Sequence, residues 1–85
     1  MENKQMTGRQ ESAKRQRWNV DLWINNDQRL YRMAFECLRH AGGNRRKGAR
    51  NMFLDLNAIG TTKTPDGYRY TISAIYDAME GMVVE

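Results

Sequence analysis

The sequence has one cysteine, one proline and no long apolar run, and each of these shortages excludes a class of protein. Because Cys37 has no second cysteine to pair with, no internal disulfide can stabilise the chain, which is consistent with a reducing compartment. No stretch of about 18 apolar residues is present, and the first residues are polar where a secretory signal needs an apolar segment. The sequence therefore predicts a cytoplasmic protein that does not enter a membrane.

The motifs that carry common enzyme chemistry are also missing. Neither the glycine-rich loop of nucleotide-binding proteins nor the GxGxxG fingerprint is present. Cys37 and His40 lie three residues apart, but two ligands do not make a zinc site, and a cysteine nucleophile needs an orienting group and an oxyanion site as well. We therefore predict no catalytic residue, no metal and no cofactor, and a protein that is not an enzyme.

What the sequence does contain is the pattern of a small helical domain. Residues 1–12 lack apolar periodicity, which predicts a flexible tail, and residues 13–85 are predicted to form one globular domain. The first helix is expected to begin after Ser12. The second is expected over residues 27–40 with Asn26 as its N-cap, and the third is expected to end at Gly60. A last helix is expected over residues 71–83.

The predicted class is thus an all-α bundle of three to four helices with a disordered basic tail. The stretch of residues 18–24 leaves an alternative open, because its apolar residues alternate as they do in a strand. Paired with residues 68–72, it would give an α+β fold with a two-stranded sheet covered by helices. Pro65 and Gly67 predict a turn between the last two helices.

The net charge of +4 is concentrated in two basic zones. One precedes the tryptophan-rich stretch and the other opens the third predicted helix, where cations lie unfavourably beside the positive end of the helix dipole. The zones are residues 1–17 and 39–50, and the candidates within them for binding a partner are Lys14, Arg15, Arg17, Arg45, Arg46, Lys47 and Arg50. Three interpretations follow: a solvated basic surface, contact with an acidic protein surface, or direct binding of phosphates.

Aromatic residues supply two further candidates for a binding surface. Trp18 and Trp23 are both expected in the core of so small a chain, yet residues five apart cannot share one face of a straight helix. One of them is therefore a candidate interface anchor. Tyr68 and Tyr70, on either side of Arg69, are candidates for stacking on nucleic-acid bases, against the alternative that they pack inside the fold.

Several residues of the tryptophan-rich stretch form a motif, which continues weakly into Pro65-Asp66-Gly67. The residues of its first part are Trp18, Asn19, Val20, Leu22, Trp23, Ile24, Asn26, Asp27, Leu30 and Tyr31. On this motif the chain resembles a family of small uncharacterised proteins from phages, prophages and archaeal viruses. It departs from that family in its basic charge and in having Arg15-Gln16-Arg17 where relatives usually have Glu-Thr. The resemblance implies a mobile genetic element as the setting and assigns no activity.

Together these features predict a protein that acts by stoichiometric binding in the cytoplasm of a host cell. The expected partner is a host protein or ribonucleoprotein complex, with the chain acting as an inhibitor of a defence system of the anti-CRISPR or anti-restriction type. The first alternative is a basic accessory protein that binds DNA or RNA. The second is a homo-oligomeric structural protein, or a homodimer, that associates through methionine-rich surfaces.

Overall fold

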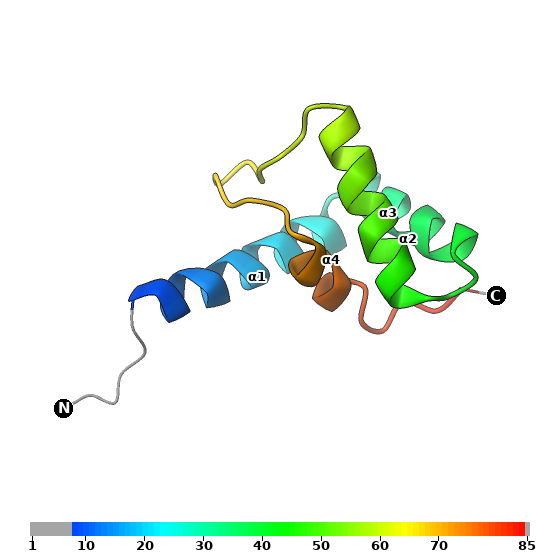
Figure 1. Cartoon of the computed structure of the whole chain (residues 1–85), viewed down its shortest axis with the longest axis horizontal. Helices are drawn as coiled ribbons and strands as arrows, with labels where there is room; N and C mark the ends of the chain where they lie inside the picture. The colour runs from blue at the N-terminus through cyan, green and yellow to red at the C-terminus, as the bar shows by residue number, and fades with distance from the viewer. Residues whose placement is uncertain (1–7, 85) are drawn as a thin grey trace.

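The structure, a computed structural model, describes the backbone of residues 8–84 and the side chains of residues 12–84, and four helices lie in this part of the chain (Figure 1). They are α1 (Gly8–Asn26), α2 (Gln28–His40), α3 (Arg45–Ala58) and α4 (Ile72–Ala78). The predicted all-α class is confirmed. The two-stranded alternative is wrong, because residues 18–24 lie inside α1 and the β-type pairing within residues 8–84 is a single bridge between Lys63 and Arg69.

The long helix α1 begins earlier than expected. It includes Ser12, the predicted N-cap, and residues 8–12 of the predicted tail, whereas residues 1–7 lie outside the described part. Asp27 alone separates α1 from α2, and its carboxylate accepts a hydrogen bond from the Leu30 amide at 3.0 Å. The predicted cap at Asn26 is therefore wrong by one residue: Asn26 ends α1 and its side-chain amide donates to the Leu22 carbonyl.

Helices α2 and α3 pair closely, while the short α4 packs against both α1 and α3 (Figure 1). Gly48 allows the approach of α2 to α3, since a Cβ at that position would lie 3.1 Å from the Leu38 Cα. Apolar side chains from all four helices, together with the Tyr70 side chain, fill the space between the helices. The largest fully buried side chains are Val20, Ile24, Met52, Leu56, Ile75 and Met79.

The segment between α3 and α4 turns as its sequence predicts. The Gly67 amide donates to the Thr64 carbonyl at 2.8 Å, and Gly67 has a φ of 93°, which favours glycine. Thr71 caps α4 as expected, accepting from the Ala74 amide, but the helix ends at Ala78 and not at residue 83. Gly81 has a φ of 87° and redirects the chain soon after this end. Within residues 8–84 no helix has the length and apolarity to span a membrane.

Candidate partner-binding surface

Trp23 is held in place by the loop between α3 and α4. Its indole Nε1 and the side-chain amide of Asn19 both donate to Oδ2 of Asp66, each at 2.8 Å. Asn19 and Trp23 are four residues apart in α1, so helical spacing brings both donors to one face. We call these three residues the Asp66 clamp, and it fastens the turn that follows Pro65 to α1.

The clamp places a charged acceptor opposite two neutral donors. Hydrogen bonds from Asn19 and then from Trp23 lower the pKa of Asp66 below its ordinary value of 3.8, because they favour the ionised carboxylate. Nearby, the side-chain amide of Gln16 donates to the Arg69 carbonyl and to the Thr71 hydroxyl. The loop is thus bonded to α1 at several points along the helix.

Trp18, in contrast, faces the solvent with 63% of its surface exposed. Leu22, one turn further along α1, is also exposed, and Lys14 precedes Trp18 by one turn. Helical spacing aligns these three residues on one side of α1. The expectation that both tryptophans lie in the core is wrong, since Trp23 is half-buried against the loop and Trp18 is exposed to solvent.

The two basic zones meet α4 from opposite sides. From α1, Arg17 forms an ion pair with Asp77 at 3.6 Å. From α3, the Arg45 Nε donates to the Tyr76 carbonyl at 2.8 Å, and its guanidinium lies 4.0 Å from the centre of the Tyr76 ring. Because Tyr76 and Asp77 are neighbours in sequence, α4 is the element to which both zones are anchored.

Arg45 differs from the other cations of its zone. It is half-buried and joined to α4, so it supports the packing of α3 on α4. Arg46, Lys47 and Arg50 are exposed and form no ion pair with another residue of the described segment. Arg46 also borders a shallow depression of about 350 Å³ beside Ile72 and Tyr76. We use the name cationic surface for the exposed cations of the two zones, which lie on α1 and α3; they are Lys14, Arg15, Arg17, Arg46, Lys47 and Arg50.

The tyrosines proposed for base stacking are not equivalent. Tyr70 belongs to the core with 4% of its surface exposed, so its ring offers no open face to a base. Tyr68 is half-buried, and the Arg69 side chain between them is exposed. The arrangement matches the packing alternative for Tyr70.

Residues 10–85 match a protein family described as a family of unknown function, DUF7249. The chain belongs to this family. No curated protein and no solved structure matches the chain. The DUF7249 region contains the whole of the Asp66 clamp and of the cationic surface.

The fold brings together Cys37 and His40, the cysteine and histidine considered in the sequence. Cys37 and His40 border a shallow pocket together with Asp55, and the Cys37 thiol donates to the Asp55 carboxylate at 3.5 Å. Burial and this carboxylate raise the pKa of Cys37 to about 11, so the sulfur is a thiol and not a nucleophilic thiolate at neutral pH. Within the described segment no cluster of three histidine, cysteine or carboxylate residues suits a metal ion.

Sequence reasoning missed the partners of Trp23. Asn19 lies between apolar residues and Asp66 lies in a turn motif, so nothing in the linear sequence joins them. The available signal was the spacing of Asn19 and Trp23, which puts two donors on one side of a helix and calls for an acceptor.

Proposed function

We propose that this protein acts by stoichiometric, non-covalent binding of an acidic macromolecular partner through its cationic surface, with Trp18 as an apolar anchor beside it. The observation that carries the proposal is the exposure of Arg46, Lys47 and Arg50 without an ion-pairing residue in the described segment. These cations occupy the N-terminal half of α3, and its first turn contains no acidic residue. An acidic partner would offset their unfavourable interaction with the helix dipole.

An exposed tryptophan strengthens the case for a protein partner. Tryptophan and arginine are the residue types that most often dominate the binding free energy of protein interfaces. Trp18 is 63% exposed, and Arg15, three residues earlier in α1, is exposed as well. Burial of the indole by a partner would therefore supply apolar contact area next to the charged contacts.

In its specific form, the proposal is that the chain comes from a phage or another mobile element and inhibits a host defence complex of the anti-CRISPR or anti-restriction type. Its support is the resemblance of the tryptophan motif to phage proteins and the cationic surface, which is suited to an acidic protein surface or to a site that normally holds nucleic acid. Inhibition would then require occupancy alone, with no reaction.

The test is affinity purification of the tagged full chain from a bacterial host after nuclease treatment, with mass spectrometry of the proteins that co-elute. The variant Arg46→Glu/Arg50→Glu reverses two exposed cations and leaves Arg45, which packs on Tyr76, unchanged. The matched control is Arg32→Glu/Arg69→Glu, which makes the same charge change at two exposed cations outside the cationic surface.

We expect a partner that co-elutes in a fixed ratio with the wild type and the control and is lost from Arg46→Glu/Arg50→Glu, with equal helicity in all three. Equal recovery from both double variants would contradict the proposal. Two other outcomes would replace it. Steeply salt-dependent binding of a DNA or RNA duplex without a protein partner would favour a nucleic-acid accessory protein. A stable oligomer in light scattering would favour a structural protein.

A further inference from the structure

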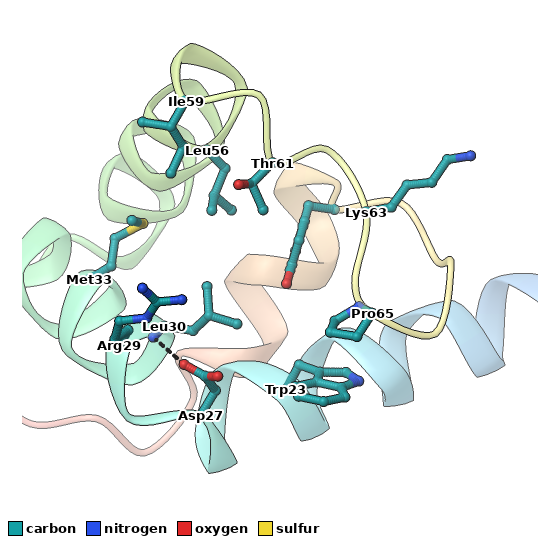
Figure 2. Close-up of a pocket in the computed structure, with 11 residues that line it drawn as sticks. Trp23, Asp27, Arg29, Leu30, Met33, Leu56, Ile59, Thr61, Lys63 and Pro65 are labelled. Carbon is teal, nitrogen blue, oxygen red and sulfur yellow. Dashed lines mark hydrogen bonds between the residues drawn. The ribbon is translucent and has the colours of Figure 1, made fainter.

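A groove of about 490 Å³ lies away from the cationic surface, where the C-terminal end of α3 faces the junction of α1 and α2. Figure 2 shows its walls: Leu56 from α3 and the C-cap residue Ile59 on one side, Leu30 and Met33 from α2 on another, and Trp23 and Pro65 opposite them. The volume lies within the roughly 300 to 1,000 Å³ range of ligand pockets. Most of the lining is apolar.

Two polar groups lie among these apolar walls. Tyr70 borders the groove and is 4% exposed, and no hydrogen bond between side chains of residues 12–84 uses its hydroxyl. Asp27 also borders the groove, and one of its carboxylate oxygens accepts from the Leu30 amide. Burial raises the pKa of Tyr70, and the negative charge of Asp27 adds to this effect. A ligand here meets a hydroxyl and a carboxylate that can still form hydrogen bonds.

The rim carries two cations and an exposed apolar side chain. Arg29 lies beside Met33, and Lys63 extends from the opposite wall toward solvent (Figure 2). Neither forms an ion pair with a side chain of residues 12–84. Ile59 at the edge is 65% exposed, so the apolar surface continues beyond the groove itself. With Asp27 counted, the groove residues have one positive charge in excess.

We propose that this groove binds an acidic peptide segment of a protein partner, in which a large apolar side chain is flanked by carboxylates. A peptide offers each group what it lacks: an apolar side chain for the walls, a main-chain N–H for Asp27, a carbonyl for the Tyr70 hydroxyl and carboxylates for Arg29 and Lys63. A small anion would leave the apolar walls uncovered. A ligand enclosed by the groove would leave Ile59 exposed, whereas a segment crossing the rim covers it.

The test is an NMR titration of the isotope-labelled full chain with the blocked tetrapeptide acetyl-Glu-Leu-Trp-Glu-amide. We expect saturable shifts of the Leu30, Ile59 and Tyr70 amides and of the Trp23 indole N–H. The basic peptide acetyl-Lys-Leu-Trp-Lys-amide lacks the carboxylates, and the polar peptide acetyl-Glu-Ser-Gly-Glu-amide lacks the apolar side chains. Each should therefore bind at least about tenfold more weakly.

Matched variants separate the groove from general charge and hydrophobicity. Arg29→Glu and Ile59→Ser should each weaken acidic-peptide binding about fivefold to tenfold. Their controls are Arg32→Glu, with the same charge change on α2, and Leu54→Ser, which removes an exposed apolar side chain of α3 outside the groove. Both controls should bind as the wild type does.

Absence of saturable shifts, shifts centred on Arg46 and Arg50, or equal binding of the basic peptide would each overturn this inference. It is independent of the proposed function, since Arg46→Glu/Arg50→Glu should keep its affinity for the acidic tetrapeptide. If no partner co-elutes but the peptide binds, the proposed function fails and the groove proposal stands. If a partner co-elutes but the peptide does not bind, the groove proposal fails and the proposed function stands.

Discussion

Trp18 and Trp23 lie five residues apart in the same helix and have opposite roles. Trp23 is half-buried and donates a hydrogen bond to Asp66 at 2.8 Å, whereas Trp18 is 63% exposed. The difference arises from the partner each meets, because the loop that follows Pro65 packs on the Trp23 side of α1 and no described element covers the other side. One tryptophan therefore builds the fold, and the other is available for contact with another molecule.

The contrast between the two tryptophans divides the residues of the tryptophan-rich motif into two groups. Asn19, Trp23 and Asp66 form the clamp, and Asp27 caps α2. Trp18 and Leu22 have no comparable structural task, since both are exposed. A sequence motif can thus contain folding residues and contact residues side by side, and the structure distinguishes between them.

The largest expected effect is the destabilisation caused by Trp23→Ala. Removing the half-buried indole takes apolar contacts from the groove wall and a donor from Asp66, so we expect the free energy of unfolding to fall by about 2 to 3 kcal/mol. Trp18→Ala, the matched control, should change it by less than about 0.5 kcal/mol. Urea unfolding followed by circular dichroism measures both. Equal losses from the two variants would show that the tryptophans do not differ in role.

Asn19→Ala should have the next largest effect. Asn19 is 4% exposed, and its side-chain amide donates to Asp66, but its Oδ1 is buried without a hydrogen-bond partner in the described segment. The variant loses the hydrogen bond to Asp66, but it also removes the unpaired buried oxygen. We therefore expect the free energy of unfolding to fall by about 1 kcal/mol. Asn57→Ala, at an exposed position of α3, is the control for the same urea experiment. An unchanged or raised stability would mean that the clamp contributes nothing.

A smaller effect is expected from acid. The folded-state pKa of Asp66 is lowered, so its contribution to stability is complete above the ordinary value of 3.8 and is lost as the pH falls through the folded value. The thermal unfolding midpoint should therefore decrease as the pH is lowered below 3.8. Asp66→Asn keeps an accepting oxygen but cannot ionise, and its midpoint should depend less on pH in this range. The same acid dependence in both proteins would exclude Asp66 as its source.

The smallest perturbation is conservative replacement of one tryptophan to observe the other by fluorescence. In Trp23→Phe the emission comes from Trp18, and in Trp18→Phe it comes from Trp23. We expect neutral acrylamide to quench Trp18 more than Trp23, following exposure. Because Lys14 and Arg15 are close by in α1, the ratio of iodide quenching to caesium quenching should be higher for Trp18 than for free N-acetyltryptophanamide. Similar acrylamide quenching of the two residues, or a ratio for Trp18 no higher than that of the free indole, would contradict the arrangement.

Local patterns in the sequence are sufficient for much of the fold. The apolar spacing of α2 and α3 predicts both helices, and Gly67 and Thr71 act as the turn and cap residues they indicate. The strand-like alternation of residues 18–24 is misleading, because buried Val20 and Ile24 lie one helical turn apart while exposed Leu22 falls between them. Ile59 fits the apolar pattern of α3 but follows the last residue of that helix, Ala58, and is exposed.

The candidate sites depend more on contacts between distant residues. The exposure of Arg46 and Arg50 follows from charge alone, but the use of Arg45 in packing requires Tyr76, which is 31 residues away. The Asp66 clamp joins residues separated by 47 and 43 positions. The groove likewise combines residues from α1, α2, α3 and the loop, so no local pattern in the sequence identifies it.

The most direct test of these roles is quantitative capture of the proposed partner by Trp18→Ala and Trp23→Phe, each normalised to its folded fraction. Trp23→Phe keeps an aromatic ring in the fold and loses the donor to Asp66, whereas Trp18→Ala removes the exposed ring. We predict that Trp18→Ala loses most of the co-eluting partner and that Trp23→Phe retains it. Retention by Trp18→Ala and loss by Trp23→Phe would contradict the division of roles between the two tryptophans.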